Sequence, residues 1–524
     1  MMTRLRYYVG AASLAAAAAG LAQPALAAGR TAEQILGETC AACHAKEGDQ
    51  QFSRISHQRK TPEGWLMSIA RMQVMHGVKI DDADRRTLVK YLADRQGLAP
   101  SETEGVRYAM ERRLNTVEQF DDQFAQMCAR CHSGARVALQ RRPAKEWEHL
   151  VNFHLGQWPS LEYQAQSRDR DWLPIALGEM VPQLASRYAL DNPAWADWQK
   201  ARPSAAALPG QWSFSGHMPA RGDVRGVMTV SAAEGDSFRV ELKGQYADGK
   251  PLAGSGSAIL YNGYEWRGNL KVDGVTMRQV FSALNGEIQG RMFESEHDER
   301  GLDFVAAKTG TPRLLAVQPG YLKAGSTAEL TLVGSDLSGT PDFGPGVAVV
   351  KVLEQSPERM RVQVRAATDA AAGNRAVALG ALKGANLAVY REVSEVKVVP
   401  AFSVARIGGN GGSTPKVQGR FEAEAWGQDA AGQAFRIGYL PAQWAVEPFN
   451  EQAVEDEDVK FAGTMHADGV FVPGDAGPNP ARKMSTNNAG NLKVIARVED
   501  GGKPLEGEGQ LIVTVQRWNN PPLP

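Results

Sequence analysis

Cys40-Ala41-Ala42-Cys43-His44 and Cys128-Ala129-Arg130-Cys131-His132 are the two stretches that decide the fold of the N-terminal part of this 524-residue chain. Cys-x-x-Cys-His is the attachment pattern of a c-type haem. Its two thiols reach two vinyl groups on one porphyrin edge, and the adjacent histidine faces the iron. The pentads together use all four cysteines of the chain. We therefore predict two covalently bound haems, attached through Cys40 and Cys43 and through Cys128 and Cys131, with His44 and His132 as the proximal iron ligands.

Other uses of cysteine fit this pattern less well. Four cysteines in 524 residues are too sparse for a disulfide framework. A thioredoxin-like redox pair gives no reason for a histidine to follow it twice. A zinc ribbon normally keeps its cysteine pairs closer together than they are here.

Residues 1–27 have the features of a secretory signal peptide. Arg4 and Arg6 precede an apolar run over residues 9–22, and Ala25-Leu26-Ala27 supplies the small-x-small pattern of a cleavage site. The run is short and alanine-rich, which disfavours a retained membrane anchor. Because covalent haem is attached outside the cytoplasm, we expect a mature chain that begins near Ala28 and lies in the periplasm.

The overall composition predicts a soluble protein of several domains. The chain is too long for a single core, and its contents of 43% hydrophobic and 22% charged residues are ordinary. The 59 acidic residues nearly balance the 58 basic ones. This balance gives no support for a nucleic-acid partner or for a polybasic contact with a membrane.

Residues 28–200 are expected to form a dihaem cytochrome c domain of two repeats, at about 28–105 and 106–200. A short helix over 31–39 leads into the first pentad. A second helix, capped by Asp81 or Asp82, carries an apolar face and ends near Gly97. The residues of that face are Leu88, Val89 and Leu92.

The repeat also indicates the distal iron ligands. Aligning Trp65 with Trp147 brings Met72 opposite His154, with a small shift between Arg59-Lys60-Thr61-Pro62 and Arg141-Arg142-Pro143. Both residue types ligate haem iron. We predict Met72 as the distal ligand of the first haem and His154 as that of the second.

Each distal ligand has rivals that the sequence leaves open. For the second haem, Gly178-Glu179-Met180-Val181-Pro182 is typical of a methionine–proline distal loop, and His149 is a further imidazole. Methionine at helical spacing is also a common core filler. The rivals at the first haem are Met67, Met75, His57 and His76.

The two ligand sets predict different reduction potentials. A thioether ligand raises the potential relative to a second imidazole. The His44/Met72 haem is therefore expected to be the upper one and the His132/His154 haem the lower one, giving two separated one-electron steps.

After residue 200 the pattern changes from helical to alternating. Phe238, Val240 and Leu242 alternate with charged residues, which is typical of strands with one buried face. Residues 208–310 are expected to form an antiparallel β-barrel, with turns at Asp248-Gly249, Asn262-Gly263, Asp273-Gly274 and Asn285-Gly286.

Two immunoglobulin-like β-sandwich domains are expected to follow, at 311–399 and 400–524. The first contains a strand over 328–334 and is expected to close with a strand at 396–399; the second ends with a strand over 511–515. The β region shows no nucleophile elbow, phosphate loop or zinc-protease helix. We assign no chemistry to the isolated His217, His297 and His466, which we expect at the surface or in turns.

The pentads, the motifs Trp65-x6-Met72 and Trp147-x6-His154, and three β domains in this order resemble the alpha (dihaem) subunit of quinohemoprotein amine dehydrogenase. The resemblance covers the whole mature chain, although its sharp motifs lie in the first 180 residues. It implies a role in the oxidation of primary amines to aldehydes and ammonia. It also implies a beta subunit that forms a propeller and a gamma subunit that carries cysteine tryptophylquinone. Since all four cysteines here are committed to haem, the quinone belongs on the partner, and the catalytic amine chemistry takes place there.

By this resemblance the chain accepts electrons from the quinone and passes them to a soluble acceptor, a cupredoxin or a cytochrome c. Two other functions remain open. A dihaem cytochrome c peroxidase would need an open coordination site for peroxide. A stand-alone dihaem electron carrier would use its β domains for docking.

Overall fold

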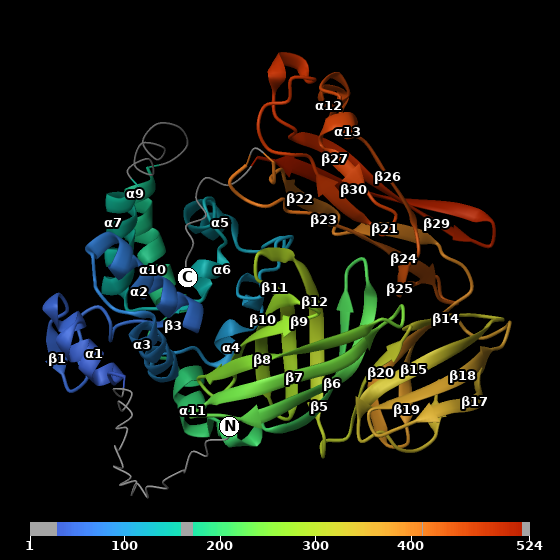
Figure 1. The fold of residues 1–524 in the computed structure, drawn as a ribbon, viewed down its shortest axis with the longest axis horizontal. Coiled ribbons are helices and arrows are strands. Elements are labelled where there is room, and N and C mark those ends of the chain that lie inside the picture. Colours follow the sequence, from blue (N-terminus) through green and yellow to red (C-terminus); the bar gives the residue numbers. More distant parts are fainter. Residues whose placement is uncertain (1–28, 159–170, 411, 516–524) are drawn as a thin grey trace, which may run out of the picture.

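The structure is a computed structural model that describes residues 29–158, 171–410 and 412–515. The predicted signal peptide at 1–27 lies outside the described residues. A helical region is followed by a closed barrel and two further β units (Figure 1). The chain is thus α and then mostly β, as the sequence predicted. Within the described ranges, no helix is long and apolar enough to cross a bilayer.

The helical region contains short helices and four very short strands. Its strands are β1 (Lys46–Gly48), β2 (Gln51–Phe52), β3 (Arg59–Lys60) and β4 (Gln140–Arg141). Its helices are α1 (Ala32–Glu38), α2 (Pro62–His76), α3 (Asp82–Arg95), α4 (Pro100–Thr103), α5 (Asp122–Cys128), α6 (Ala135–Ala138), α7 (Ala144–Gln157), α9 (Trp172–Ile175), α10 (Val181–Arg187) and α11 (Pro193–Ala201).

Side-chain caps mark the start of the two helices on either side of the first pentad, α1 and α3. The Thr31 hydroxyl and the Gln34 side chain form a capping box at the start of α1, and Asp81 caps α3 by accepting from the Asp84 amide. Ile35 and the predicted apolar face of α3 are buried. The two helices predicted around the first pentad are therefore confirmed.

Eight antiparallel strands close into a barrel, in the order β10-β11-β12-β5-β6-β7-β8-β9. Closure leaves no free sheet edge. The strands are β5 (Gly210–Met218), β6 (Gly222–Ala232), β7 (Ser237–Tyr246), β8 (Pro251–Tyr261), β9 (Glu265–Val272), β10 (Val275–Leu284), β11 (Glu287–Glu294) and β12 (His297–Lys308).

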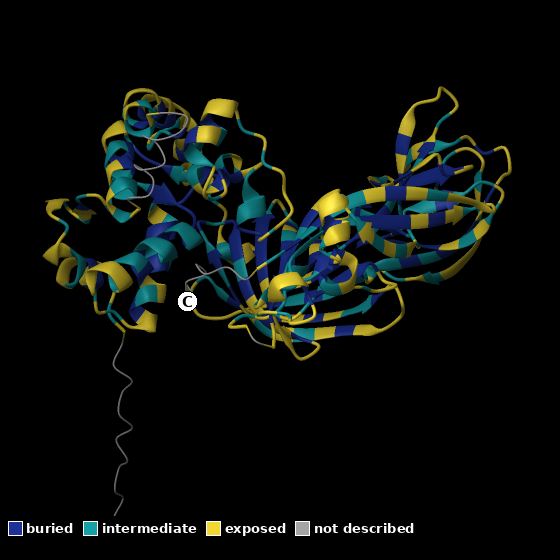
Figure 2. Cartoon of the chain, turned by 90° about the horizontal axis from the view of Figure 1, so that it is seen from above, coloured by how far each residue is buried: buried dark blue, intermediate teal, exposed yellow. Residues whose placement is uncertain are grey.

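The predicted alternation and turns of the barrel are confirmed. Phe238, Val240 and Leu242 face the core, whereas the charged residues between them are exposed (Figure 2). Asn285 and Gly286 both adopt positive φ, 52° and 73°, as a two-residue type I′ hairpin turn requires. The barrel interior is filled by aromatic and aliphatic side chains, among them Trp212, Phe214, Trp266 and Phe281.

The third unit consists of two four-stranded sheets that enclose a common apolar core, with strand orders β13-β15-β18-β17 and β14-β20-β19-β16. The predicted strand over 328–334 lies within β15. The strands are β13 (Arg313–Gln318), β14 (Tyr321–Lys323), β15 (Thr327–Ser335), β16 (Pro341–Asp342), β17 (Val347–Gln355), β18 (Arg359–Ala366), β19 (Gly373–Leu379) and β20 (Leu382–Tyr390).

The C-terminal unit has sheets in the orders β21-β24-β25, β22-β30-β29-β26 and β23-β28-β27. Its elements are β21 (Glu395–Val399), β22 (Phe402–Arg406), β23 (Gly419–Arg420), β24 (Glu422–Gln428), β25 (Ala434–Leu440), β26 (Gln443–Pro448), α12 (Glu451–Glu455), α13 (Asp458–Phe461), β27 (Gly463–Met465), β28 (Val470–Pro473), β29 (Gly490–Asp500) and β30 (Lys503–Thr514).

One strand does not lie where the sequence predicted it. The strand at 396–399 was expected to close the third unit, but β21 pairs along its length with β24 of the C-terminal unit. Val396 and Val398 are buried in the C-terminal core. Their alternation shows one buried face, but it does not show which sheet supplies the partner strand.

The helical region sits on one end of the barrel through buried polar contacts. The carbonyl of Leu98 accepts hydrogen bonds from the Asn262 amide (2.6 Å) and from the Tyr264 hydroxyl (3.1 Å). The Tyr264 hydroxyl also lies 3.1 Å from that of Thr103. These contacts fix the helices on the barrel rather than leaving them on a free linker.

Candidate haem sites

The two halves of the helical region meet in a two-stranded antiparallel pair. In this pair Arg59 of β3 lies opposite Arg141 of β4. One constant spacing relates Arg59 to Arg141, Trp65 to Trp147 and Met72 to His154. The small shift in the sequence alignment is therefore confined to the prolines, because Pro62 and Pro143 are one residue closer together.

Backbone contacts repeat between the halves as well. The amide of Lys60 donates to the carbonyl of Gln96 (3.0 Å), and the amide of Arg142 donates to that of Tyr188 (3.1 Å). Gln96 and Tyr188 both end the helix that closes their half. The repeat is thus structural and not only a similarity of motifs.

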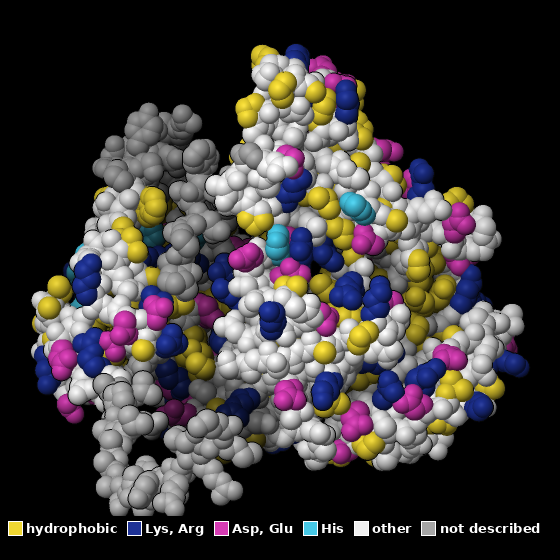
Figure 3. All heavy atoms as spheres, viewed as in Figure 1, with side chains coloured by type: hydrophobic (Ala, Val, Ile, Leu, Met, Phe, Trp, Pro, Cys, Tyr) yellow, Lys and Arg dark blue, Asp and Glu magenta, His cyan; other side chains and the backbone are white. Residues whose placement is uncertain are grey.

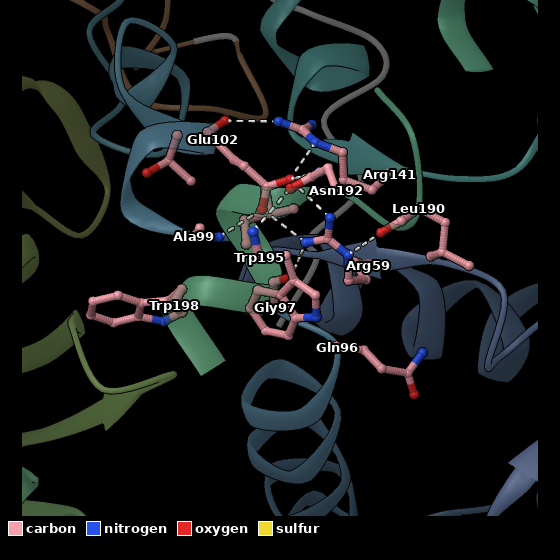
Figure 4. Close-up of polar contacts among 12 residues, drawn as sticks. Arg59, Gln96, Gly97, Ala99, Glu102, Arg141, Leu190, Asn192, Trp195 and Trp198 are labelled. Carbon is pink, nitrogen blue, oxygen red and sulfur yellow. Dashed lines mark hydrogen bonds and ion pairs between the residues drawn. The ribbon is translucent and has the colours of Figure 1, made fainter. Parts of the chain in front are cut away.

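Glu102, from the segment that joins the halves, binds both paired arginines (Figure 4). Its carboxylate accepts from Arg59 Nη1 and Nη2 (2.8 and 2.9 Å), Arg141 Nε (2.8 Å) and Asn192 Nδ2 (2.7 Å). The side chains of Glu102, Arg59 and Arg141 are only 4 to 6% exposed. Burial disfavours the charged carboxylate, but the two guanidinium groups outweigh it and lower the pKa of Glu102 to about 2.

The first pentad lies in a single 3-10 turn directly after α1. The amides of Cys43 and His44 both donate to the carbonyl of Cys40 (3.2 and 3.0 Å). His44 Nδ1 lies 2.8 Å from the carbonyl oxygen of Ser53. A carbonyl oxygen only accepts, so Nδ1 carries the proton, and Nε2 of His44 is left bare for a metal.

The second pentad begins at the C-terminal end of α5. Cys128 is partly buried and Cys131 is exposed. Burial raises the pKa of the Cys128 thiol to about 12. His132 Nδ1 lies 2.9 Å from the carbonyl oxygen of Ser133, which leaves its Nε2 bare in the same way.

The structure brings the two predicted ligands of the second haem close together, with their rings tilted against each other. The ring centres of His132 and His154 are 6.4 Å apart, with an interplanar angle of 44°. A metal–imidazole bond is about 2 Å long and the ring centre lies roughly 1 Å further, so two imidazoles on one iron have ring centres roughly 6 Å apart. The separation therefore fits an iron bound between them.

Both rings of this pair are held in the form that binds a metal. His154 Nδ1 donates to the carbonyl of Leu150, one turn earlier in α7 (2.8 Å). Burial lowers the pKa of both His132 and His154, and the nearby Arg71 and Arg136 lower it further. The imidazoles are thus neutral, as metal ligation requires.

The predicted distal ligand of the first haem lies on α2. Met72 is half-buried there. In the described structure no hydrogen bond or ring contact joins it to His44, so this pairing stays a prediction. Its rivals His76 and Met75 are exposed in the last turn of α2, and Met75 is 45% exposed. His57 is engaged with the Glu47 carboxylate (2.7 Å).

The rival segment at the second haem is not a loop. Residues 176–180 form a turn of π-helix that continues into α10, with Pro182 in the first turn, where proline is tolerated. Met180 is 1% exposed and packs in the apolar cluster around Phe124 and Trp147. The segment of the rival ligand Met180 is therefore helical and not a methionine–proline loop. His149 is half-buried on α7.

The alternative cysteine chemistries also find no support in the geometry. The four cysteines form no disulfide. Among the described residues, no three His, Cys, Asp or Glu side chains are placed to hold a metal ion together, so the pentads do not combine into a zinc site.

The sequence did not reveal the roles of Glu102 and His217, nor the contacts of Met67. Glu102 carries no motif, and its role depends on a contact with both halves. Met67, a rival iron ligand in the sequence, instead receives hydrogen bonds at its sulfur from Arg71 and Arg136 (3.2 and 2.9 Å).

His217 is half-buried in strand β5 rather than in a turn. It bridges Asp223 (2.8 Å) and, across the domain junction, Glu422 (2.6 Å).

His217 lines a cavity of about 1230 Å³ between the barrel and the two later units. On the face shown in Figure 3, acidic and basic side chains are interspersed. This mixture agrees with the near balance of charge in the sequence.

Comparisons with known proteins agree with this geometry. Four family models match consecutive segments: quinohemoprotein amine dehydrogenase A, alpha subunit, haem binding, over residues 30–195, and alpha-subunit domains II, III and IV over 205–309, 311–391 and 396–523. No curated protein matches the chain.

Two solved structures illustrate resemblance to parts of the chain. The redesigned β-barrel mFAP1 bound to DFHBI shares 17% identity, covering 20% of this chain and 97% of its own, with a TM-score of 0.19. Mouse clustered PcdhgC3 EC1-3 shares 10% identity, covering 44% of this chain and 76% of its own, with a TM-score of 0.16. The four family matches cover nearly all the described residues in order, and the chain therefore belongs to the family of quinohemoprotein amine dehydrogenase alpha subunits.

Proposed function

We propose that this chain is the electron-transfer subunit of a periplasmic amine dehydrogenase. It accepts electrons from a peptide-derived quinone on a partner subunit and delivers them to a soluble acceptor, a cupredoxin or a cytochrome c. The observation that carries the proposal is the neighbouring pair His132 and His154, whose ring centres are 6.4 Å apart and whose Nδ1 atoms both lie beside backbone carbonyls. The family supplies the multisubunit context.

In this proposal the cysteines hold two haems through thioether bonds. Cys40 and Cys43 hold one beside His44, and Cys128 and Cys131 hold the other beside His132. Each cysteine pair lies at the end of a helix. Cys40 and Cys43 follow α1, and Cys128 is the last residue of α5. When bound, haem iron supplies reversible one-electron redox chemistry.

Backbone carbonyls would orient the proposed histidine ligands. Each proposed imidazole ligand donates its Nδ1 proton to a backbone carbonyl: His44 to Ser53, His132 to Ser133 and His154 to Leu150. Such second-shell hydrogen bonds fix the tautomer and increase the basicity of Nε2. With Met72 as its distal ligand, the first haem is expected to have the higher reduction potential of the two.

The amine chemistry is assigned to a partner. All four cysteines lie in the pentads, so no cysteine of this chain remains for a cysteine tryptophylquinone. We therefore expect a small gamma subunit that bears the quinone and a propeller beta subunit. The β units of this chain would hold them.

A peroxidase fits the second site less well. A peroxidase needs an open coordination site on its iron, whereas His132 and His154, with ring centres 6.4 Å apart, would both be available to hold the iron here. A stand-alone electron carrier would share this site, and only the presence of partners distinguishes it from the dehydrogenase subunit.

The test begins with the purified holo-chain. Two haems per chain, retained in a denaturing gel, are expected, and Cys128→Ser with Cys131→Ser should leave one. The native complex should contain a companion chain that stains for a quinone, and adding a primary amine should reduce the haems. A colourless chain would refute the haem proposal. A coloured monomer without partners, unreactive to amine, would support the stand-alone carrier instead.

A further inference from the structure

Two arginines from different halves of the helical region meet at one sulfur atom. Arg71 lies on α2 of the first half, and Arg136 lies on α6 of the second. Their Nη2 atoms are 3.2 and 2.9 Å from Met67 Sδ. A thioether is a weak acceptor and carries no charge, so this contact neutralises neither guanidinium.

The two guanidinium groups lie beside the imidazole pair of the second site. The Arg71 guanidinium carbon is 5.9 Å from the centre of the Phe153 ring, and that ring is 6.2 Å from the ring of His154. Arg136 lies in α6, four residues after His132 in the chain.

The surroundings contain more positive than negative charge. Burial lowers the pKa of Lys60 there, and the charges of Arg142, Arg71 and Arg136 lower it further, whereas the Glu146 carboxylate raises it. Glu146 is already shared between Arg54 (2.9 Å) and Arg142 (3.6 Å). In the described ranges, neither Arg71 nor Arg136 has a carboxylate within 4.0 Å. Placing further uncompensated cations in a partly buried site is costly, so an anionic group is expected here.

We propose that Arg71 and Arg136 bind the propionate carboxylates of the haem held between His132 and His154. This inference rests on the covalent haem of the proposed function. Two guanidinium groups match two carboxylates in charge, and arginine recognises a carboxylate through a planar, bidentate pair of donors. Helix α2 then contributes to both sites through adjacent residues, Arg71 to the second and Met72 to the first.

A positive charge near an iron favours the reduced state, which carries one positive charge less. Removing one guanidinium is therefore expected to lower the potential of the second haem. Arg136 is the better position to test, because Arg71 is adjacent to the proposed ligand Met72. Arg136→Lys keeps the charge, and Arg239→Gln removes one from an exposed position on the barrel strand β7.

The experiment is a potentiometric titration of the holo-chain, with haem content and the low-spin spectrum recorded for each variant. Arg136→Gln should shift the one-electron equilibrium of the lower haem about tenfold towards the oxidised form, which corresponds to 59 mV. Arg136→Lys should keep most of the wild-type potential, and Arg239→Gln should leave it unchanged. If Arg136→Gln carries both haems with the spectrum and potentials of Arg239→Gln, this inference is wrong while the proposed function stands. A wild-type chain without haem would overturn both.

Discussion

Glu102 is the residue whose loss should most directly uncouple the two halves of the haem-binding region. Glu102→Gln keeps the size of the side chain but removes the charge that Arg59 and Arg141 share. Two buried guanidinium groups, paired across β3 and β4, would then face each other without a carboxylate. Removing one partner of a buried ion pair typically costs about 3 to 5 kcal/mol.

The pKa of Glu102 gives an independent magnitude. It is about 2, against an ordinary value of 4.5. Since a tenfold change in proton affinity is worth about 1.4 kcal/mol, the charged form contributes about 3 kcal/mol to folding. A lowered folded-state pKa means that this contribution is complete above pH 4.5 and is lost as the pH falls towards 2.

Urea unfolding followed by the helical far-ultraviolet signal measures this contribution. In the described chain only α12 and α13 lie outside the haem-binding region, so the signal reports on that region. At pH 7, Glu102→Gln should be about 3 kcal/mol less stable than wild type, and the difference should shrink by about 2 kcal/mol at pH 3. Glu104→Gln, at an exposed position two residues later, is the matched control. A difference that does not depend on pH, or an equal loss in the control, would refute the reasoning.

Three further changes test other parts of the structure. Met72→Ala should shift only the upper of two haem potentials in a redox titration; a shift of the lower one would contradict the ligand assignment. Burial opposes the charge on His217, but its two carboxylate partners raise its pKa to about 9. The contribution of the charged ring to the stability of the fold is therefore complete below pH 6.5 and is lost as the pH rises through about 9. The protection factors for hydrogen exchange at the junction of barrel and C-terminal unit, which correct for the base-catalysed rise of the intrinsic rate, should therefore fall between pH 7 and about pH 10 in wild type, and those of His217→Gln should not. In Gly256→Ala the added Cβ would lie 2.1 Å from the carbonyl oxygen of Asn269, so thermal unfolding should show a loss of about 3 kcal/mol or more, and an unchanged midpoint would refute the close approach.

The sequence predicted the parts of the fold that depend on local patterns. Turns such as Asn285-Gly286 need positive φ at both positions, and few residue types supply it. The capped start of α3 at Asp81 and the alternation of Phe238, Val240 and Leu242 are likewise local signals. Each is decided within one or two turns of chain, and each was confirmed.

The parts that the sequence did not reveal depend on contacts between distant residues. The strand at 396–399 has the pattern of either β unit, and only its pairing with β24 assigns it. Met180 is in a proline-containing segment that could form a loop, but packing against Trp147 keeps it helical. Glu102 looks like any acidic residue at a helix start until Arg59 and Arg141 are brought to it.

The two halves of the helical region are held together by polar contacts, which restrict their relative movement more than apolar contacts would. Apolar interfaces tolerate sliding and repacking, because contact energy depends weakly on direction. The Glu102 carboxylate instead accepts from donors on both halves at 2.7 to 2.9 Å, and such bonds weaken steeply when their angles change. The same pairing of β3 with β4 orients α2 and α7, which carry Met72 and His154. Any relative movement of the two proposed iron sites must therefore strain this buried network first. Under the proposed function, the residues that hold the halves together would also fix the distance that an electron crosses.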